Sequence, residues 1–112
     1  MNSDNYDPEK GAIKLDKGKP KWDLLPLDAL DEVAQVFTYG ADKYQPYNWL
    51  NDMRYGRYIA ATFRHLRDFW LGEDIDQESG RHHLAHAAAN MLMLLASIKR
   101  KRGVDDRNTV PH

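Results

Sequence analysis

Residues 84–98 read LAHAAANMLMLLASI, and this stretch decides the fold class. Apart from His86, Asn90 and Ser97, every residue in it is apolar, so a helix built from it is apolar around most of its circumference. In a chain of 112 residues, such a helix is typical of the centre of a bundle or of a subunit interface. We predict that it begins near Ser79 and ends near Arg100.

Two further helices are predicted earlier in the chain. From Leu27 to Tyr39 the apolar residues recur on one stripe, and Gly40 is expected to end this helix. From Arg54 or Tyr55 to Leu71, two adjacent apolar stripes predict a helix buried on two sides. The sequence has no strand-length alternation and no internal repeat. It therefore predicts an all-α fold, a compact bundle of three main helices with short helical turns, whose core is completed by oligomerisation.

The sequence predicts one domain with flexible ends. Residues 1–13 are polar, rich in Asn, Asp, Pro and Gly, and are interpreted as a flexible arm. A single helical domain is expected over residues 14–102, followed by a flexible tail over residues 103–112.

Composition limits the classes of partner. The 16 Lys and Arg nearly balance the 17 Asp and Glu, which gives no reason to propose duplex nucleic acid or a membrane surface. Cysteine is absent, which excludes disulfides, thiolate zinc sites and a cysteine nucleophile. The polar N-terminus lacks the features of a signal peptide, and no apolar run reaches the roughly 18 residues of a membrane span. We expect a cytoplasmic protein, in the host cytoplasm if it is encoded by a phage.

A cluster of acids and histidines is the first candidate site. Four carboxylates, on Glu73, Asp74, Asp76 and Glu78, precede a helix on which His83, His86 and Asn90 share one face. Polar groups on an apolar helix cost free energy unless they have partners. They could bind a metal or phosphate, or simply form hydrogen bonds inside a helical core. We predict a metal site of Glu73, Asp76, His83 and His86.

His65 is a candidate for the same site. If the second and third helices are antiparallel neighbours, His65 lies about two turns before the acidic loop and His86 about two turns after Ser79. Their depths then match, which predicts a shared cleft. A lone mid-helix histidine is otherwise more typical of a core or an interface.

Basic and aromatic loop residues form a second group of candidates. Lys17, Lys19 and Lys21 lack the spacing of a P-loop, so a solvated basic loop is an equally good interpretation. Tyr44, Asn48 and Trp49 could stack on a base and form hydrogen bonds to it, or could form a lid over the core.

Several of these segments resemble a known family. Residues 15–26, 39–44 with Asn48 and Trp49, 72–80 and 83–88 are similar to a small family common in bacteriophage genomes, the N-terminal domain of dATP/dGTP diphosphohydrolases. The resemblance runs over residues 13–98 and implies hydrolysis of purine deoxynucleoside triphosphates to monophosphate and pyrophosphate. The all-α MazG-like pyrophosphohydrolases run the same reaction. They hold magnesium or manganese with Glu-x-x-Glu and Glu-x-x-Asp helices in a four-helix arrangement, usually completed by oligomerisation.

The chain departs from that metal pattern. Gln35 stands three residues after Glu32, where a second carboxylate is expected, and the Glu73/Asp76 pair precedes the last helix. Imidazoles favour manganese, iron, cobalt, nickel or zinc over magnesium. The expected cofactor is a divalent metal, manganese or magnesium.

Three functions are compatible with these features. The first is metal-dependent hydrolysis of dATP or dGTP, with Glu73 or His65 as the base. Its substrate-binding residues would be Lys19, Lys21, Lys43, Tyr44, Asn48, Trp49, Arg57 and Asn90. The second is a non-catalytic nucleotide-binding protein, such as a phage sponge that sequesters a host nucleotide signal. The third is a helical oligomerisation or regulatory module. The expected partners are a nucleotide or other phosphorylated small molecule and further copies of the chain, as a homodimer or higher homo-oligomer.

Overall fold

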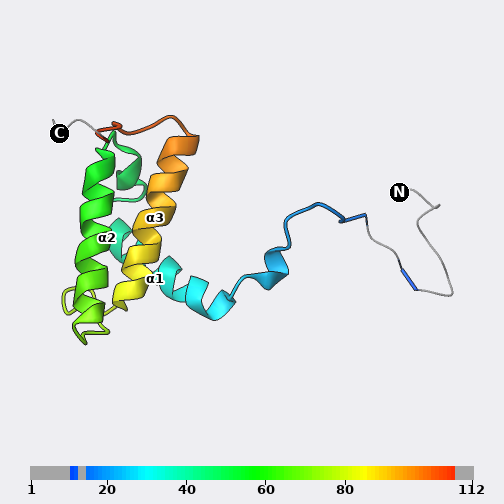
Figure 1. The fold of residues 1–112 in the computed structure, drawn as a ribbon, viewed down its shortest axis with the longest axis horizontal. Helices are drawn as coiled ribbons and strands as arrows, with labels where there is room; N and C mark the ends of the chain where they lie inside the picture. The colour runs from blue at the N-terminus through cyan, green and yellow to red at the C-terminus, as the bar shows by residue number, and fades with distance from the viewer. Residues whose placement is uncertain (1–10, 13–14, 108–112) are drawn as a thin grey trace.

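The fold is all-α, as predicted. The computed structural model describes residues 11–12 and 15–107. Its elements are the 3-10 helices η2 (Trp22–Leu24) and η3 (Asn48–Leu50) and the α-helices α1 (Leu27–Lys43), α2 (Tyr55–Trp70) and α3 (His83–Lys99) (Figure 1). Isolated bridges join Arg54 to Val104 and Ile75 to His82.

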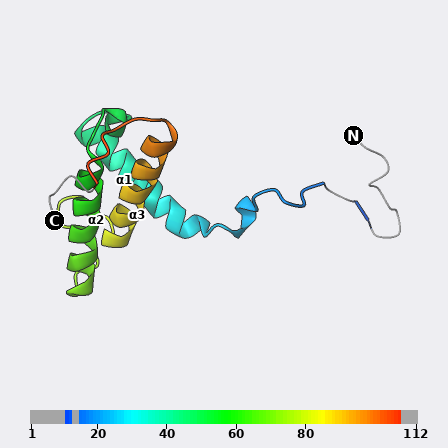
Figure 2. The same ribbon diagram turned by 45° about the horizontal axis from the view of Figure 1, so that its top comes forward.

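α3 lies at the centre of the bundle. It contacts both α1 and α2, forms an antiparallel hairpin with α2, and is crossed on one side by α1 (Figures 1 and 2). Val33 and Val36 of α1 pack against Ala85 and Ala89 of α3. The small alanines allow α1 to approach closely, which explains why this segment is so rich in them.

α1 does not end at Gly40, so that prediction was wrong. The helix continues to Lys43, and Gly40 accepts a hydrogen bond from the Tyr44 N–H at 2.9 Å. A glycine inside a helix costs only about 1 kcal/mol relative to alanine. The added turn allows Lys43 to join Tyr39 in binding Glu78 of the acidic loop, and such tertiary contacts outweigh the preference of glycine for a terminus.

The start of α3 also differs from the prediction. The helix begins at His83 rather than near Ser79, and it is capped by His82, whose Nδ1 accepts the Leu84 N–H at 3.0 Å. Asp76 Oδ2 accepts both the N–H and the hydroxyl of Ser79. Hydrogen bonds of this local kind compete with helix formation. Residues 75–82 consequently form a tight loop.

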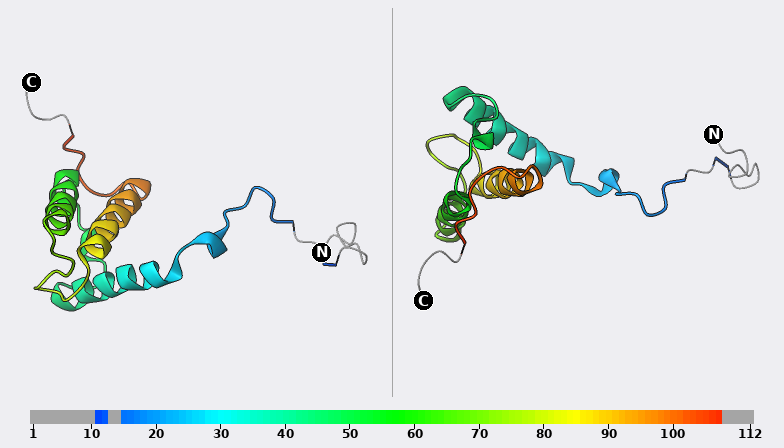
Figure 3. Two further views of the ribbon diagram at one scale, coloured as in Figure 1. Left: turned by 60° about the horizontal axis from the view of Figure 1, so that its bottom comes forward. Right: turned by 90° about the horizontal axis from the view of Figure 1, so that it is seen from above.

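The two ends of the described chain differ in their contacts with the bundle. Residues 15–26 lead away from the bundle (Figures 1 and 3). Residues 103–107, expected within the flexible tail, return to the start of α2, where the Gly103 N–H donates to Asp52 Oδ1 at 3.0 Å and the Gly56 N–H donates to Asp106 Oδ1 at 2.9 Å. Most of the predicted arm, and residues 108–112 of the predicted tail, lie outside the described residues. None of the described helices is long and apolar enough to cross a membrane.

Candidate active site

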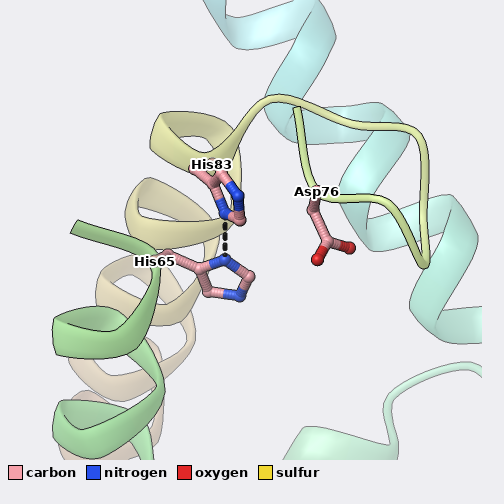
Figure 4. A group of neighbouring side chains, drawn as sticks. All are labelled: His65, Asp76 and His83. Atoms are coloured by element: carbon pink, nitrogen blue, oxygen red, sulfur yellow. Dashed lines mark hydrogen bonds between the residues drawn. The ribbon is translucent and has the colours of Figure 1, made fainter. Parts of the chain in front are cut away.

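Three histidines from α2 and α3 meet at one end of the hairpin. The rings of His65 and His86 are stacked, with centroids 4.4 Å apart and planes 7° apart. His65 Nδ1 lies 2.8 Å from Nδ1 of His83, which is buried (Figure 4). The antiparallel hairpin therefore brings His65 and His86 to the same depth, as their positions in the sequence predicted.

The acidic loop supplies carboxylates to this group. Asp76 Oδ2 lies 2.7 Å from the Ser79 hydroxyl and 3.6 Å from His86 Nε2, and the same hydroxyl lies 2.6 Å from His86 Nε2. Glu73 Oε1 lies 2.9 Å from His83 Nε2. Glu78 turns outward to Tyr39 and Lys43. These partners explain how so many acids can lie in one short loop without strong mutual repulsion.

The environment shifts the pKa values of several of these groups. Burial lowers the pKa of His65 and that of His86, and the neighbouring imidazoles lower both further. Burial alone would raise the pKa of the Asp76 carboxyl, but the hydrogen bonds from Ser79 and the nearby His86 outweigh it, and this pKa is lowered. Lys43 likewise lowers the pKa of Glu78. At neutral pH, His65 and His86 are therefore neutral and stand beside an ionised Asp76, which is the protonation state of metal ligands.

Three side chains have donor atoms close enough together to share a cation. One donor atom each from His65, Asp76 and His83 lies within 4.8 Å of the other two, and the three side chains face one another (Figure 4). Two imidazole nitrogens and one carboxylate oxygen suit manganese, iron or zinc better than magnesium. Of the predicted ligands, His83 and Asp76 belong to this group. The other two predicted ligands are outside the group, since Glu73 contacts Nε2 of His83 and His86 contacts the Ser79 hydroxyl. His65, which was predicted as a base, is the third member of the group.

A cleft of about 900 Å³ opens beside this group, between α1, α2 and η3. It is lined by His65, Asp76, Glu78 and His86, and also by the six predicted substrate-binding residues Lys43, Tyr44, Asn48, Trp49, Arg57 and Asn90. The Tyr58 hydroxyl donates to the Trp49 carbonyl at 2.8 Å and so ties η3 to α2. Lys19 and Lys21, the other predicted substrate-binding residues, do not line the cleft. They lie in the segment that leads away from the bundle.

Sequence reasoning missed part of the basic wall of this cleft. Arg64 and Arg67 line it together with Arg57, along one side of α2. Arg57 and Arg64 are seven residues apart, a spacing that puts both on one helical face. This periodicity could have identified Arg64. Ser79, near which the last helix was predicted to begin, was also missed as a partner of His86.

Comparisons with known proteins agree with the resemblance seen in the sequence. Residues 8–107 match the family described as dATP/dGTP diphosphohydrolase, N-terminal. The chain belongs to this family. It is also similar to a dATP/dGTP diphosphohydrolase of Salmonella phage PMBT28, with 34% identity over 96 residues that make up 86% of this chain and 33% of the relative. The chain thus spans about one third of that relative's length. No solved structure matches it.

The segments that carry the family resemblance converge in the fold. Residues 72–80 and 83–88 contain the acids and histidines described above, and residues 39–44 contribute Tyr39 and Lys43, which bind Glu78. Residues 15–26 are the exception, because they lie away from this end of the bundle.

Proposed function

We propose that this chain is the hydrolase domain of a metal-dependent nucleotide diphosphohydrolase. Its substrates would be purine deoxynucleoside triphosphates, dATP or dGTP, and its products the monophosphate and pyrophosphate. The observation that carries the proposal is the position of the His65, Asp76 and His83 donor group at a cleft whose α2 wall is basic. The family, and the printed name of the Salmonella phage relative, support the substrate class.

The donor set suggests which residues hold the cation. His65, Asp76 and His83 would be its ligands, and Glu73 would orient His83 by accepting a hydrogen bond from Nε2, which leaves Nδ1 directed at His65. When bound, a divalent cation supplies positive charge for a phosphoryl oxygen and makes water more acidic.

The chain's own residues would do the remaining work. Arg57 and Arg64 can contact the phosphate oxygens and stabilise the negative charge of the leaving pyrophosphate. We assign His86 as the proton acceptor for the attacking water, because it lines the cleft, is neutral at pH 7, and is held in place by Ser79. Tyr44 and Trp49, which also line the cleft, offer rings for the base.

The test is release of pyrophosphate from dATP and dGTP by the purified chain, with manganese or magnesium present. Asp76→Asn and His86→Ala should each abolish release. His82→Asn is the matched control, because His82 caps α3 outside the donor group and asparagine is a good N-cap. Full activity of both Asp76→Asn and His86→Ala would contradict the assignment of the site.

A second function is favoured by one observation. Glu32 is exposed on α1 and does not line the cleft, and Gln35, where a MazG-like enzyme has a carboxylate, is bonded to Arg81. The carboxylate pair of the magnesium enzymes is therefore missing from α1. A protein that binds a nucleotide without cleaving it would need only the basic and aromatic walls. Calorimetric binding of dGTP with intact nucleotide recovered afterwards would favour this alternative over hydrolysis.

A further inference from the structure

The α2–α3 hairpin has two broad sides, and α1 covers only one of them. The cleft and α1 lie on the same side, with Arg64 and His65 of α2 and His86 and Asn90 of α3 lining the cleft. Seen from above, α1 lies to one side of the hairpin, and the described chain puts no helix on the other (Figure 3, right).

The uncovered side is apolar along the whole hairpin. Large hydrophobic side chains are exposed at a helical spacing in both helices, namely Ile59, Phe63, Leu66 and Trp70 of α2 and Leu84, Met91, Leu95 and Ile98 of α3. We call these eight residues the apolar face. No position of either stripe holds a charged residue.

Helical geometry places both stripes on the same side. In α2, Ile59 and Phe63 of the stripe directly follow the buried Tyr58 and Thr62 in the sequence. In α3, Leu84 directly follows the buried His83. One residue is a rotation of about 100° around a helix. Because the two helices are antiparallel, the same rotation carries both stripes to one side of the hairpin. The cleft residue Arg57 directly precedes the buried Tyr58 and is carried to the opposite side, whereas Arg64 lies between the two sides, because it lines the cleft and also a hollow beside Phe63 and Leu66.

The exposed area is large for a monomer. Phe63 is 65% exposed and Trp70 is 86% exposed. The exposed parts of the eight residues together amount to roughly 900 Å², close to the ~800 Å² that each partner contributes to a standard stable interface. Monomeric proteins rarely expose a contiguous apolar patch of that size.

We propose that the apolar face binds the same face of a second copy of this chain, which gives a two-fold symmetric dimer whose centre is a four-helix bundle. A two-fold interface pairs a surface with itself, and this one can do so because its eight residues are uncharged, with Arg64 and Arg67 bordering it beside Phe63, Leu66 and Trp70. The pairing also accounts for α3 being apolar around most of its circumference, since one side packs on α1 and α2 and the other on the partner. The clefts of the two copies would face away from the interface.

Light scattering after size exclusion of the full chain tests the proposal. The mass should be twice 13.0 kDa for the unaltered chain. It should fall to the monomer value when Phe63→Glu and Leu95→Glu are combined. Leu24→Glu is the matched control, because Leu24 is a leucine on η2 that is more exposed than Leu95 and lies outside the apolar face, so the mass should stay dimeric. A monomeric mass for the unaltered chain, or a dimer that survives the double substitution, would overturn the proposal.

Chemical cross-linking tests the same interface if the double variant does not fold. The chain has no cysteine, so Met91→Cys introduces a single thiol at the middle of the apolar face. A short bis-maleimide should join two copies of this variant, whereas Thr38→Cys, on the exposed side of α1, should remain single. Equal cross-linking of the two variants, or of neither, would show that the face is not the interface and would leave another protein as its occupant.

Discussion

Glu73 Oε1 lies 2.9 Å from Nε2 of His83, so a carboxylate of the acidic loop holds the buried imidazole that begins α3. The Glu73 side chain is 46% exposed, whereas that of His83 is 1% exposed. With Nε2 occupied in this way, His83 turns Nδ1 towards His65. Glu73 therefore acts on the donor group through His83. A sequence pattern of metal ligands cannot distinguish this indirect role from that of a residue that binds the metal itself.

The first prediction concerns this contact. Glu73→Ala should weaken manganese binding about 10- to 100-fold, the usual effect of removing a residue that orients a ligand. Glu73→Gln should lose less, because its carbonyl oxygen can still accept from Nε2. Titration of manganese by calorimetry measures both. Asp74→Asn, a change at an exposed carboxylate of the same loop, is the control and should leave the affinity unaltered.

The second prediction concerns the basic wall of the cleft. Arg64→Ala should weaken nucleotide binding about 10- to 100-fold, because a charge-assisted hydrogen bond is worth about 1.5–3 kcal/mol. Lys19→Ala serves as the control, since Lys19 does not line the cleft of its own chain. Binding of dGTP is measured by calorimetry. An equal loss in both variants would mean that residues 15–26 also reach a nucleotide.

The third prediction is a loss of stability in mild acid. Burial lowers the pKa of both His65 and His86, so the unfolded chain binds protons that the folded chain does not as the pH falls below about 6.5, the ordinary value for histidine. In EDTA, the thermal midpoint should fall between pH 7.5 and 5.5. His65→Gln combined with His86→Gln should flatten this dependence. A midpoint independent of pH in the unaltered chain would show that these histidines are protonated as readily when folded as when unfolded.

The fourth prediction compares two glycines. Gly103 has φ +87°, and a Cβ there would lie 2.9 Å from the Met53 carbonyl oxygen, so Gly103→Ala should cost on the order of 1–3 kcal/mol. Gly40 lies inside α1 with nothing within 4 Å of an added Cβ, so Gly40→Ala should stabilise the fold by about 0.5–1 kcal/mol. Urea unfolding measures both. Opposite signs are expected, and equal effects would contradict the assigned return of residues 103–107 to α2.

Periodicity within single helices was enough to predict much of this protein. The apolar run from Leu84 to Ile98 predicted a central helix. The depths of His65 and His86 on two antiparallel helices predicted that they would meet. Both conclusions depend only on the fixed rise and turn of a helix and on a short connection, which are local quantities that a sequence determines.

Side-chain contacts that no periodicity reveals decided the rest. α1 passes through Gly40 because Tyr39 and Lys43 bind Glu78, which is distant in the chain. The later start of α3, at His83, has a local cause, the hydrogen bonds that Ser79 donates to Asp76. The way residues 71–82 fold over α1 decides that Asp76 joins His65 and His83 in the donor group and that Glu73 only contacts His83. A local preference of about 1 kcal/mol is small enough for a few such contacts together to reverse it. The boundaries of the helices and the roles within the site therefore follow from the assembled bundle, while its helices and their meeting point are already present in the sequence.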